Sequence, residues 1–139
     1  MEIITEQCSV PTKGESEVVD ITGRLEEILT KHRLNDGLMT VFVSGSTASV
    51  TTTEFEPGLR QDIPDMLNRI IPRGARYRHD ETWHDGNGHS HVRAAFMGPS
   101  LSVPFSKGSL ALGTWQQVVL VDHDNRPRDR VIVVQLMGV

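Results

Sequence analysis

The hydrophobic residues recur with two different periods along the chain. Over residues 21–33 and again over residues 59–70 they return every three or four positions, which is typical of helices that bury one face. Elsewhere, short runs of apolar and β-branched residues end at glycine, proline or polar turn residues and predict strands. The predicted helices cover residues 22–33, 59–70 and 88–97. The predicted strands cover residues 2–10, 16–21, 38–43, 48–53, 101–105, 109–112, 116–122 and 130–137.

The order of these elements predicts an α+β fold. Strands and helices do not alternate regularly, so we expect sheets with helices packed on them and not a parallel βαβ fold. Residues 73–88 have no apolar period and are interpreted as a long polar loop, while the turn at residues 124–127 is expected to join the last two strands as a hairpin. Pro64 is expected either to bend the second helix or to start a new one. No repeat or linker interrupts the chain, which predicts a single domain over residues 1–139.

The charge and cysteine content narrow the function classes. The chain has 14 Lys plus Arg against 18 Asp plus Glu, a net charge of −4, which argues against nucleic acid or an anionic membrane as the partner. No apolar run is long enough for a membrane span, and residues 1–6 lack the pattern of a secretory signal. The single cysteine, Cys8, fits a reducing compartment. We therefore expect a cytoplasmic protein.

Histidines are concentrated in one short segment, and they are the first candidates for chemistry. Four of the six histidines lie within this segment: His79, His84, His89 and His91. Imidazole is the commonest transition-metal ligand and a proton carrier near neutral pH, although a solvated polar loop has the same composition. If the segment is helical at its end, the rings of His89 and His91 point about 200° apart, which weakens them as a chelating pair. The remaining histidines, His32 and His123, are interpreted as surface residues.

Two carboxylates are candidates for acid–base work or for further ligands. Glu54 follows the predicted strand 48–53, and Asp62 lies shortly after Gly58 near the next helix. The alternatives are structural: Asp62 caps a helix that begins at Pro64, and Glu54 is a surface charge.

Four other residues are candidates for substrate binding. Ser46 lies in a glycine- and hydroxyl-rich break between strands, which suits either an anion nest or an ordinary tight turn. In the run Thr114-Trp115-Gln116, the indole would stack on a planar ring while the amide contacts its polar edge. The alternative for Trp115 is an anchor in the core or in a subunit interface.

Several motifs together resemble one protein family. They are Asn87-Gly88-His89-Ser90-His91, Ser100-Leu101-Ser102-Val103-Pro104-Phe105 with Lys107-Gly108, and Leu112-Gly113-Thr114-Trp115-Gln116. In this order they resemble the YjbQ family, whose members are described as secondary thiamine-phosphate synthases. The resemblance covers nearly the whole chain, and it implies a mixed α+β sandwich, a homotrimer, and a polar pocket that binds a metal ion.

The resemblance also implies roles for particular residues. The family's recurrent polar positions fall on Glu54, Asp62, His79, His91, Trp115 and Gln116. The first four are expected to be catalytic. Thr114, Trp115, Gln116 and Ser46 are expected to bind substrate, and His79, His89 and His91 to hold a divalent metal such as Zn²⁺ or Mg²⁺.

One departure from the family pattern puts a complete metal site in question. Many members have His-Thr-Ser where this chain has Gly45-Ser46-Thr47, so one imidazole is missing. The implied reaction joins a pyrimidine diphosphate to a thiazole phosphate and releases diphosphate, which requires cations to neutralise the leaving group. The alternative is a trimer that binds a metal or a small ligand without turnover.

Overall fold

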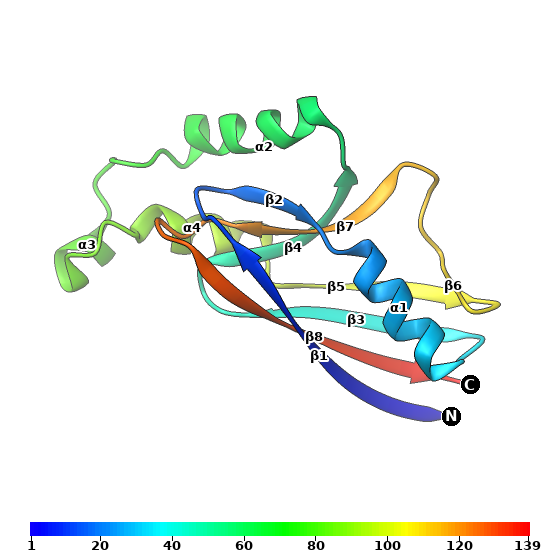
Figure 1. Ribbon diagram of the computed structural model, residues 1–139. Helices are drawn as coiled ribbons and strands as arrows, with labels where there is room; N and C mark the ends of the chain where they lie inside the picture. Colours follow the sequence, from blue (N-terminus) through cyan, green and yellow to red (C-terminus); the bar gives the residue numbers. More distant parts are fainter.

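Two antiparallel β-sheets face each other across the main hydrophobic core of the computed structural model, which describes residues 1–139 (Figure 1). The five-stranded sheet has the order β1-β8-β3-β5-β6, and the three-stranded sheet has the order β2-β7-β4. The strands are β1 (Glu2–Thr12), β2 (Glu17–Asp20), β3 (Gly37–Ser44), β4 (Ala48–Glu54), β5 (Ser100–Ser106), β6 (Ser109–Leu110), β7 (Gln116–Asp122) and β8 (Arg128–Gly138).

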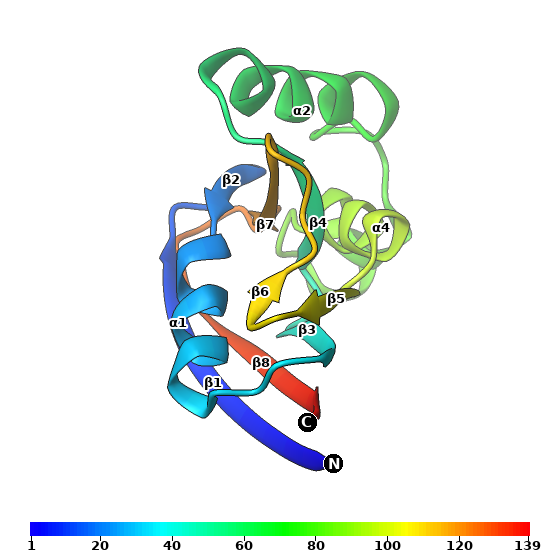
Figure 2. The same cartoon turned by 90° about the vertical axis from the view of Figure 1, so that its right-hand side faces the viewer.

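Three helices pack against this sandwich, α1 (Thr22–His32), α2 (Pro57–Ile70) and α4 (Gly88–Met97), and a fourth, α3 (Arg78–Trp83), packs against α4. Helix α1 lies along one side of the sandwich and places Leu25 and Leu29 in the core between the sheets (Figure 2). A second, smaller apolar cluster joins the outer face of the three-stranded sheet to side chains from α2, α4 and the segment before α2. None of the four helices has the length and apolar composition needed to cross a lipid bilayer.

The periodicity of each strand follows from its place in the sandwich. Strand β8 alternates, with Ile132, Val134 and Leu136 buried in the core and the residues between them turned outward. Residues 118–121 of β7 are all buried, because one face meets the core and the other is covered by the second cluster. The α+β sandwich predicted from the sequence is confirmed.

The predicted hairpin between the last two strands is wrong. Strand β7 pairs with β2 and β4, whereas β8 pairs with β1 and β3, so residues 123–127 cross from one sheet to the other. The side chains of Asp122 and Asp124 accept hydrogen bonds from the backbone N–H groups two residues onward and stabilise this crossing without a hairpin. His123, interpreted as a surface residue, is fully buried at the same place.

Two helix predictions also need correction. The expected loop over residues 73–88 contains α3, a short helix whose side chains are largely exposed and which therefore has no apolar period. Helix α2 begins at Pro57 and continues through Pro64, so Asp62 lies inside it and does not cap it. The cap is Glu56, whose side chain accepts hydrogen bonds from the backbone N–H groups of Gly58 and Leu59.

Candidate metal-binding site

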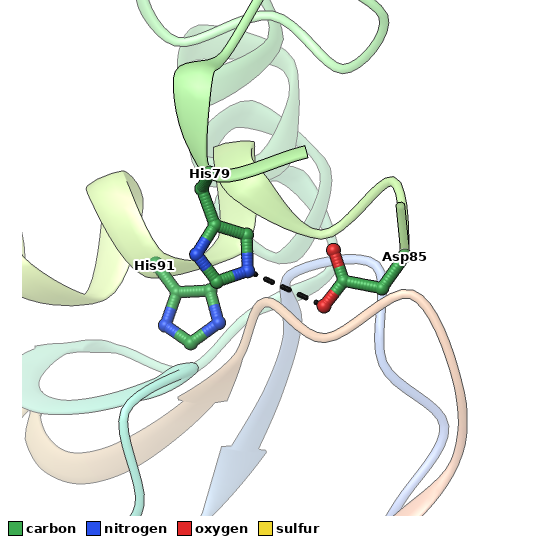
Figure 3. A group of neighbouring side chains, drawn as sticks. All are labelled: His79, Asp85 and His91. Atoms are coloured by element: carbon green, nitrogen blue, oxygen red, sulfur yellow. Dashed lines mark hydrogen bonds and ion pairs between the residues drawn. The ribbon is translucent and has the colours of Figure 1, made fainter. Parts of the chain in front are cut away.

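Two imidazoles and a carboxylate converge where α3 approaches α4. His79 projects from α3, His91 from α4 and Asp85 from the segment between them (Figure 3). One potential ligand atom from each residue lies within 4.8 Å of the other two. His79 Nε2 is 3.3 Å from Asp85 Oδ2, and the centroids of the two rings are 4.2 Å apart. Donors of these types at this spacing are able to bind one metal ion from three directions.

Hydrogen bonds hold the segment that carries Asp85. The Asp85 side chain accepts a hydrogen bond from the backbone N–H of Asn87 at 3.1 Å. The backbone carbonyl of Asp85 accepts a hydrogen bond from the Asn125 side chain at 2.8 Å. The carboxylate of Asp80 accepts from the backbone N–H of Gly88 at 2.8 Å. Gly88 is required here, because a Cβ atom would lie 2.4 Å from Cβ of Tyr77. The turn is therefore built to bring the two short helices close together.

The electrostatics of the cluster favour the metal-binding forms of two of its members. Burial lowers the pKa of His91, and the neighbouring His79 lowers it further, so His91 is neutral at neutral pH. Partial desolvation raises the pKa of Asp85, but hydrogen bonds from the Asn87 backbone and His79 outweigh it, and the pKa is lowered overall. A neutral imidazole and an ionised carboxylate are the forms that coordinate a cation.

A shallow pocket adjoins the cluster. Its volume is about 340 Å³, and it is lined by Gly45, Ser46, Ala48, His91, Ala94, Ala95 and Pro99. The predicted substrate-binding residue Ser46 therefore lies beside the predicted ligand His91. The rest of the lining is small or apolar, so His91 is the ionisable side chain of this surface.

His89 is turned away from the cluster. It is buried, its Nε2 lies 3.3 Å from the Ser90 hydroxyl, and its ring is 6.4 Å from that of Tyr77. Helical geometry explains this, because residues two positions apart point to different sides of a helix. The structure does not bring His89 together with His79 and His91 and places Asp85 in the cluster instead.

Comparison with known proteins places the chain in a family. The family model described as UPF0047 protein YjbQ-like matches residues 6–139. The chain belongs to the YjbQ-like UPF0047 family. A UPF0047 protein of Mycobacterium tuberculosis is 43% identical over 115 residues, which are 82% of this chain and 84% of that protein. A UPF0047 protein of Archaeoglobus fulgidus is 33% identical over 131 residues, covering 94% of this chain and 99% of the relative.

Solved structures of family members share the fold. A YbjQ-like protein of unknown function from Sulfolobus solfataricus superposes with a TM-score of 0.88 at 30% identity, covering 99% of this chain and 100% of that one. An uncharacterised conserved YjbQ/UPF0047 protein from Clostridium acetobutylicum gives a TM-score of 0.87 at 31% identity, covering 95% and 99%. The recognition of a YjbQ-like protein from the sequence is confirmed, and the function of the family stays open.

In this YjbQ-like chain, the predicted site residues Glu54, Thr114, Trp115 and Gln116 lie at the end of the three-stranded sheet opposite His91. Glu54 ends β4 directly opposite Gln116 of β7, and the Gln116 side chain donates to the Thr52 hydroxyl at 3.1 Å. From Ala48, near His91, to Glu54 the strand rises about 20 Å. Thr114, Glu54 and Trp115 are exposed, and Trp115 is 72% exposed, so its interpretation as a core anchor is wrong. Asp62 is exposed on α2.

Asp85 is the residue of the cluster that sequence reasoning missed. It lies in the polar segment that was singled out for its histidines, with five residues between it and each of His79 and His91. A carboxylate midway between two candidate ligands is a usable signal. The sequence alone does not distinguish Asp85 from the neighbouring acidic residues Asp80 and Glu81. In the structure these two have other partners: Asp80 accepts a hydrogen bond from Gly88, and Glu81 forms an ion pair with Arg76.

Proposed function

We propose that this YjbQ-like protein is a divalent-metal enzyme acting on a small phosphorylated substrate at the cluster of His79, Asp85 and His91. The observation that carries the proposal is the convergence of three potential ligand atoms within 4.8 Å beside a pocket. A solvated polar loop, the alternative interpretation of this segment, does not require its histidines and a carboxylate to meet.

The donor set favours a first-row transition ion such as Zn²⁺ over Mg²⁺. Imidazole nitrogen suits Zn²⁺, whereas Mg²⁺ prefers oxygen ligands alone. The His79 side chain is 29% exposed and the Asp85 side chain is 42% exposed, so three protein donors leave coordination positions open toward solvent. This pattern is typical of catalytic sites and differs from the closed four-ligand sets of structural zinc sites.

Thiamine-phosphate synthesis is the named candidate reaction, and its support is the family resemblance. Joining a pyrimidine diphosphate to a thiazole phosphate releases diphosphate and needs no oxidant or reductant. A bound divalent ion would neutralise charge on the leaving diphosphate. For the chain itself, the tasks are to hold the ion with His79, Asp85 and His91 and to receive part of the substrate in the pocket beside Ser46.

A His91→Ala chain should bind Zn²⁺ about 100-fold more weakly than the parent chain, because one of three donors is lost. Titration calorimetry with the metal-free protein measures this, and the same samples are assayed for thiamine phosphate formed from the two precursors. His84→Ala is the matched control, since His84 is exposed, neighbours the site and is outside the cluster.

Each outcome of this experiment decides a part of the proposal. Equal Zn²⁺ affinity in the parent and His91→Ala chains would remove the metal site. Weaker binding by His91→Ala, together with turnover in the parent chain that this variant loses, supports the full proposal. Metal binding without turnover in any chain would leave the alternative function, a metal-binding protein without catalysis.

We also propose that the protein assembles as a homotrimer in the cytoplasm. The outward face of the five-stranded sheet exposes large apolar side chains from its neighbouring strands β3 and β8: Leu38, Phe42, Val131 and Met137. An apolar patch of this kind is typical of an interface between protein chains. A trimer also offers a way for Trp115 of one copy to approach His91 of another, since the two lie at opposite ends of the sheet in one chain. The free Cys8 fits a reducing compartment.

Light scattering tests the assembly. The parent chain should have three times the mass of one chain, and Phe42→Asp should reduce it, because a charge would be buried in the apolar interface. Met66→Asp, which places the same charge on an exposed apolar position of α2, should leave the mass unchanged. A mass equal to one chain for the parent protein would contradict the trimer.

A further inference from the structure

We infer that Arg130, reached through the gap left by Gly45, forms an oxyanion-binding subsite next to the His91 pocket. The ligand class is a small molecule that carries a phosphate or carboxylate group. The inference starts from a buried guanidinium group of which one nitrogen has no partner in the protein.

Arg130 is held in one position by its buried contacts. Its side chain is 8% exposed, and it forms a two-point ion pair with Asp122, in which Nε donates to Oδ2 at 2.6 Å and Nη2 donates to Oδ1 at 2.8 Å. Nη2 also donates to the hydroxyl of Thr47. A guanidinium group that is fixed at two of its nitrogens is oriented for its third.

The third nitrogen, Nη1, donates to no acceptor within the chain. No fully buried side-chain nitrogen or oxygen of the structure lacks a hydrogen-bond partner, so Nη1, which has none, is at least partly accessible. Nη1 therefore has N–H groups without an acceptor in the chain, on a guanidinium group that Asp122 holds in place. Donors of this kind bind anionic oxygens more strongly than neutral donors do.

Gly45 is what opens the way to Nη1. A Cβ atom built on Gly45 would lie 2.7 Å from Nη1, and its next neighbour within 4 Å is Cζ of the same arginine. Gly45 does not have a positive φ, so its backbone does not require glycine. The absent side chain leaves room directly over the free end of Arg130, which the bonds to Asp122 prevent from retreating.

The surrounding charges leave this end of Arg130 free for an anion. The acidic neighbours of Arg130 are Asp122 and Asp124, and both carboxylates already accept hydrogen bonds from other groups of the protein. Asp122 accepts from Arg130, Thr12 and the Asp124 backbone, while Asp124 accepts from Thr47, Arg128 and the Arg126 backbone. The exposed residues Ser44 and Ser46 flank Gly45 and offer further hydroxyl donors.

The location links this subsite to the metal cluster. Arg130 itself does not line that pocket, but Gly45 lines it together with His91, and Nη1 lies next to Gly45, so an anionic group held at Nη1 would lie beside the pocket. Its role beside a metal ion rests on the proposed function, whereas the contact between an oxyanion and Arg130 does not. The subsite would orient a phosphorylated substrate by one end while the cluster holds the reacting end.

Binding of inorganic phosphate to the metal-free protein tests the contact, with acetate compared at equal ionic strength. Gly45→Ala should weaken phosphate binding about tenfold, because its Cβ covers a charge-assisted donor. Gly23→Ala is the matched control, since a Cβ there meets nothing within 4 Å, and it should leave the affinity unchanged. Preference for phosphate over acetate indicates a phosphorylated ligand, and the reverse indicates a carboxylate.

A second measurement covers the case in which Gly45→Ala disturbs the fold. In the parent chain labelled with ¹⁵N-arginine, phosphate should shift the guanidinium resonance of Arg130 more than those of the other arginines. Equal phosphate affinity in the parent and Gly45→Ala chains, or an unshifted Arg130 resonance, overturns the subsite even if Zn²⁺ binds. Failure of the parent chain to bind Zn²⁺ removes the proposed function and leaves the phosphate result standing.

Discussion

An Asp122→Asn chain should unfold with a free energy about 3–5 kcal/mol smaller than that of the parent chain. Asp122 is fully buried and pairs through both oxygens with Arg130. Desolvation raises the pKa of Asp122, but hydrogen bonds from Arg130 and Thr12 outweigh it, so the pKa is lowered overall and the group is ionised. The amide has nearly the same shape, yet it removes the carboxylate that binds Arg130 at two points and leaves only Asp124, whose Oδ2 is 3.7 Å from Nη2 of Arg130.

Urea unfolding at neutral pH, followed by circular dichroism, measures this loss. The control is Asp129→Asn, which removes a carboxylate from an exposed position of β8, the strand that carries Arg130. It should change the free energy of unfolding by less than about 0.5 kcal/mol. If both variants lose the same small amount, the buried pair does not hold the two sheets together at this crossing.

Most of the fold could be predicted from the sequence, because the burial of one face of a strand or helix sets the spacing of its hydrophobic residues. The alternation along β8 and the helical spacing of Leu25 and Leu29 follow directly from one buried face each. The hairpin error shows where this information ends. The pattern of β7 and β8 reports that each strand is buried, but it does not report which strands lie beside them.

The site was predictable in part for a related reason. His79 and His91 could be predicted as site residues because histidines are rare and four of them are clustered within residues 79–91. Asp85 could not, because it is one of several acidic residues there. The run Asp122-His123-Asp124 has the composition of a surface turn. It is buried because Arg128 and Arg130 of the next strand provide partners, together with the hydroxyl groups of Ser16 and Thr47, which are distant in sequence. Partners of this kind cannot be assigned before the strand order is known.

The most buried histidine should make the protein sensitive to mild acid. The pKa of His123 is lowered from 6.5 to about 3, mainly by burial and to a smaller extent by the nearby positive charge of Arg93. Its Nδ1 lies 2.8 Å from the Ser16 hydroxyl and its Nε2 lies 3.1 Å from the Ser49 hydroxyl. Both ring nitrogens are thus engaged inside the protein, and the folded chain has no place for a charged ring there.

The direction of the pH effect follows from the proton count. Between pH 6.5 and about 3 the unfolded chain binds a proton at His123 that the folded chain excludes. The stability that His123 contributes is therefore fully present above pH 6.5 and falls by about 1.4 kcal/mol per pH unit as the pH decreases. The total loss approaches about 5 kcal/mol at pH 3. The lowered pKa values of His89 and His91 add to the fall in the same direction.

Replacing His123 with glutamine isolates its contribution. The amide retains a donor and an acceptor for the two serines but does not titrate, so the stability of His123→Gln should fall less steeply between pH 6.5 and 5, by about 1.4 kcal/mol per unit. Urea unfolding at several pH values within this window keeps the carboxylates ionised. His84→Gln, which removes an exposed histidine, should keep the parent slope. Parallel slopes for the parent and His123→Gln chains would show that the folded protein admits the proton at His123, against the burial that the two serine contacts imply.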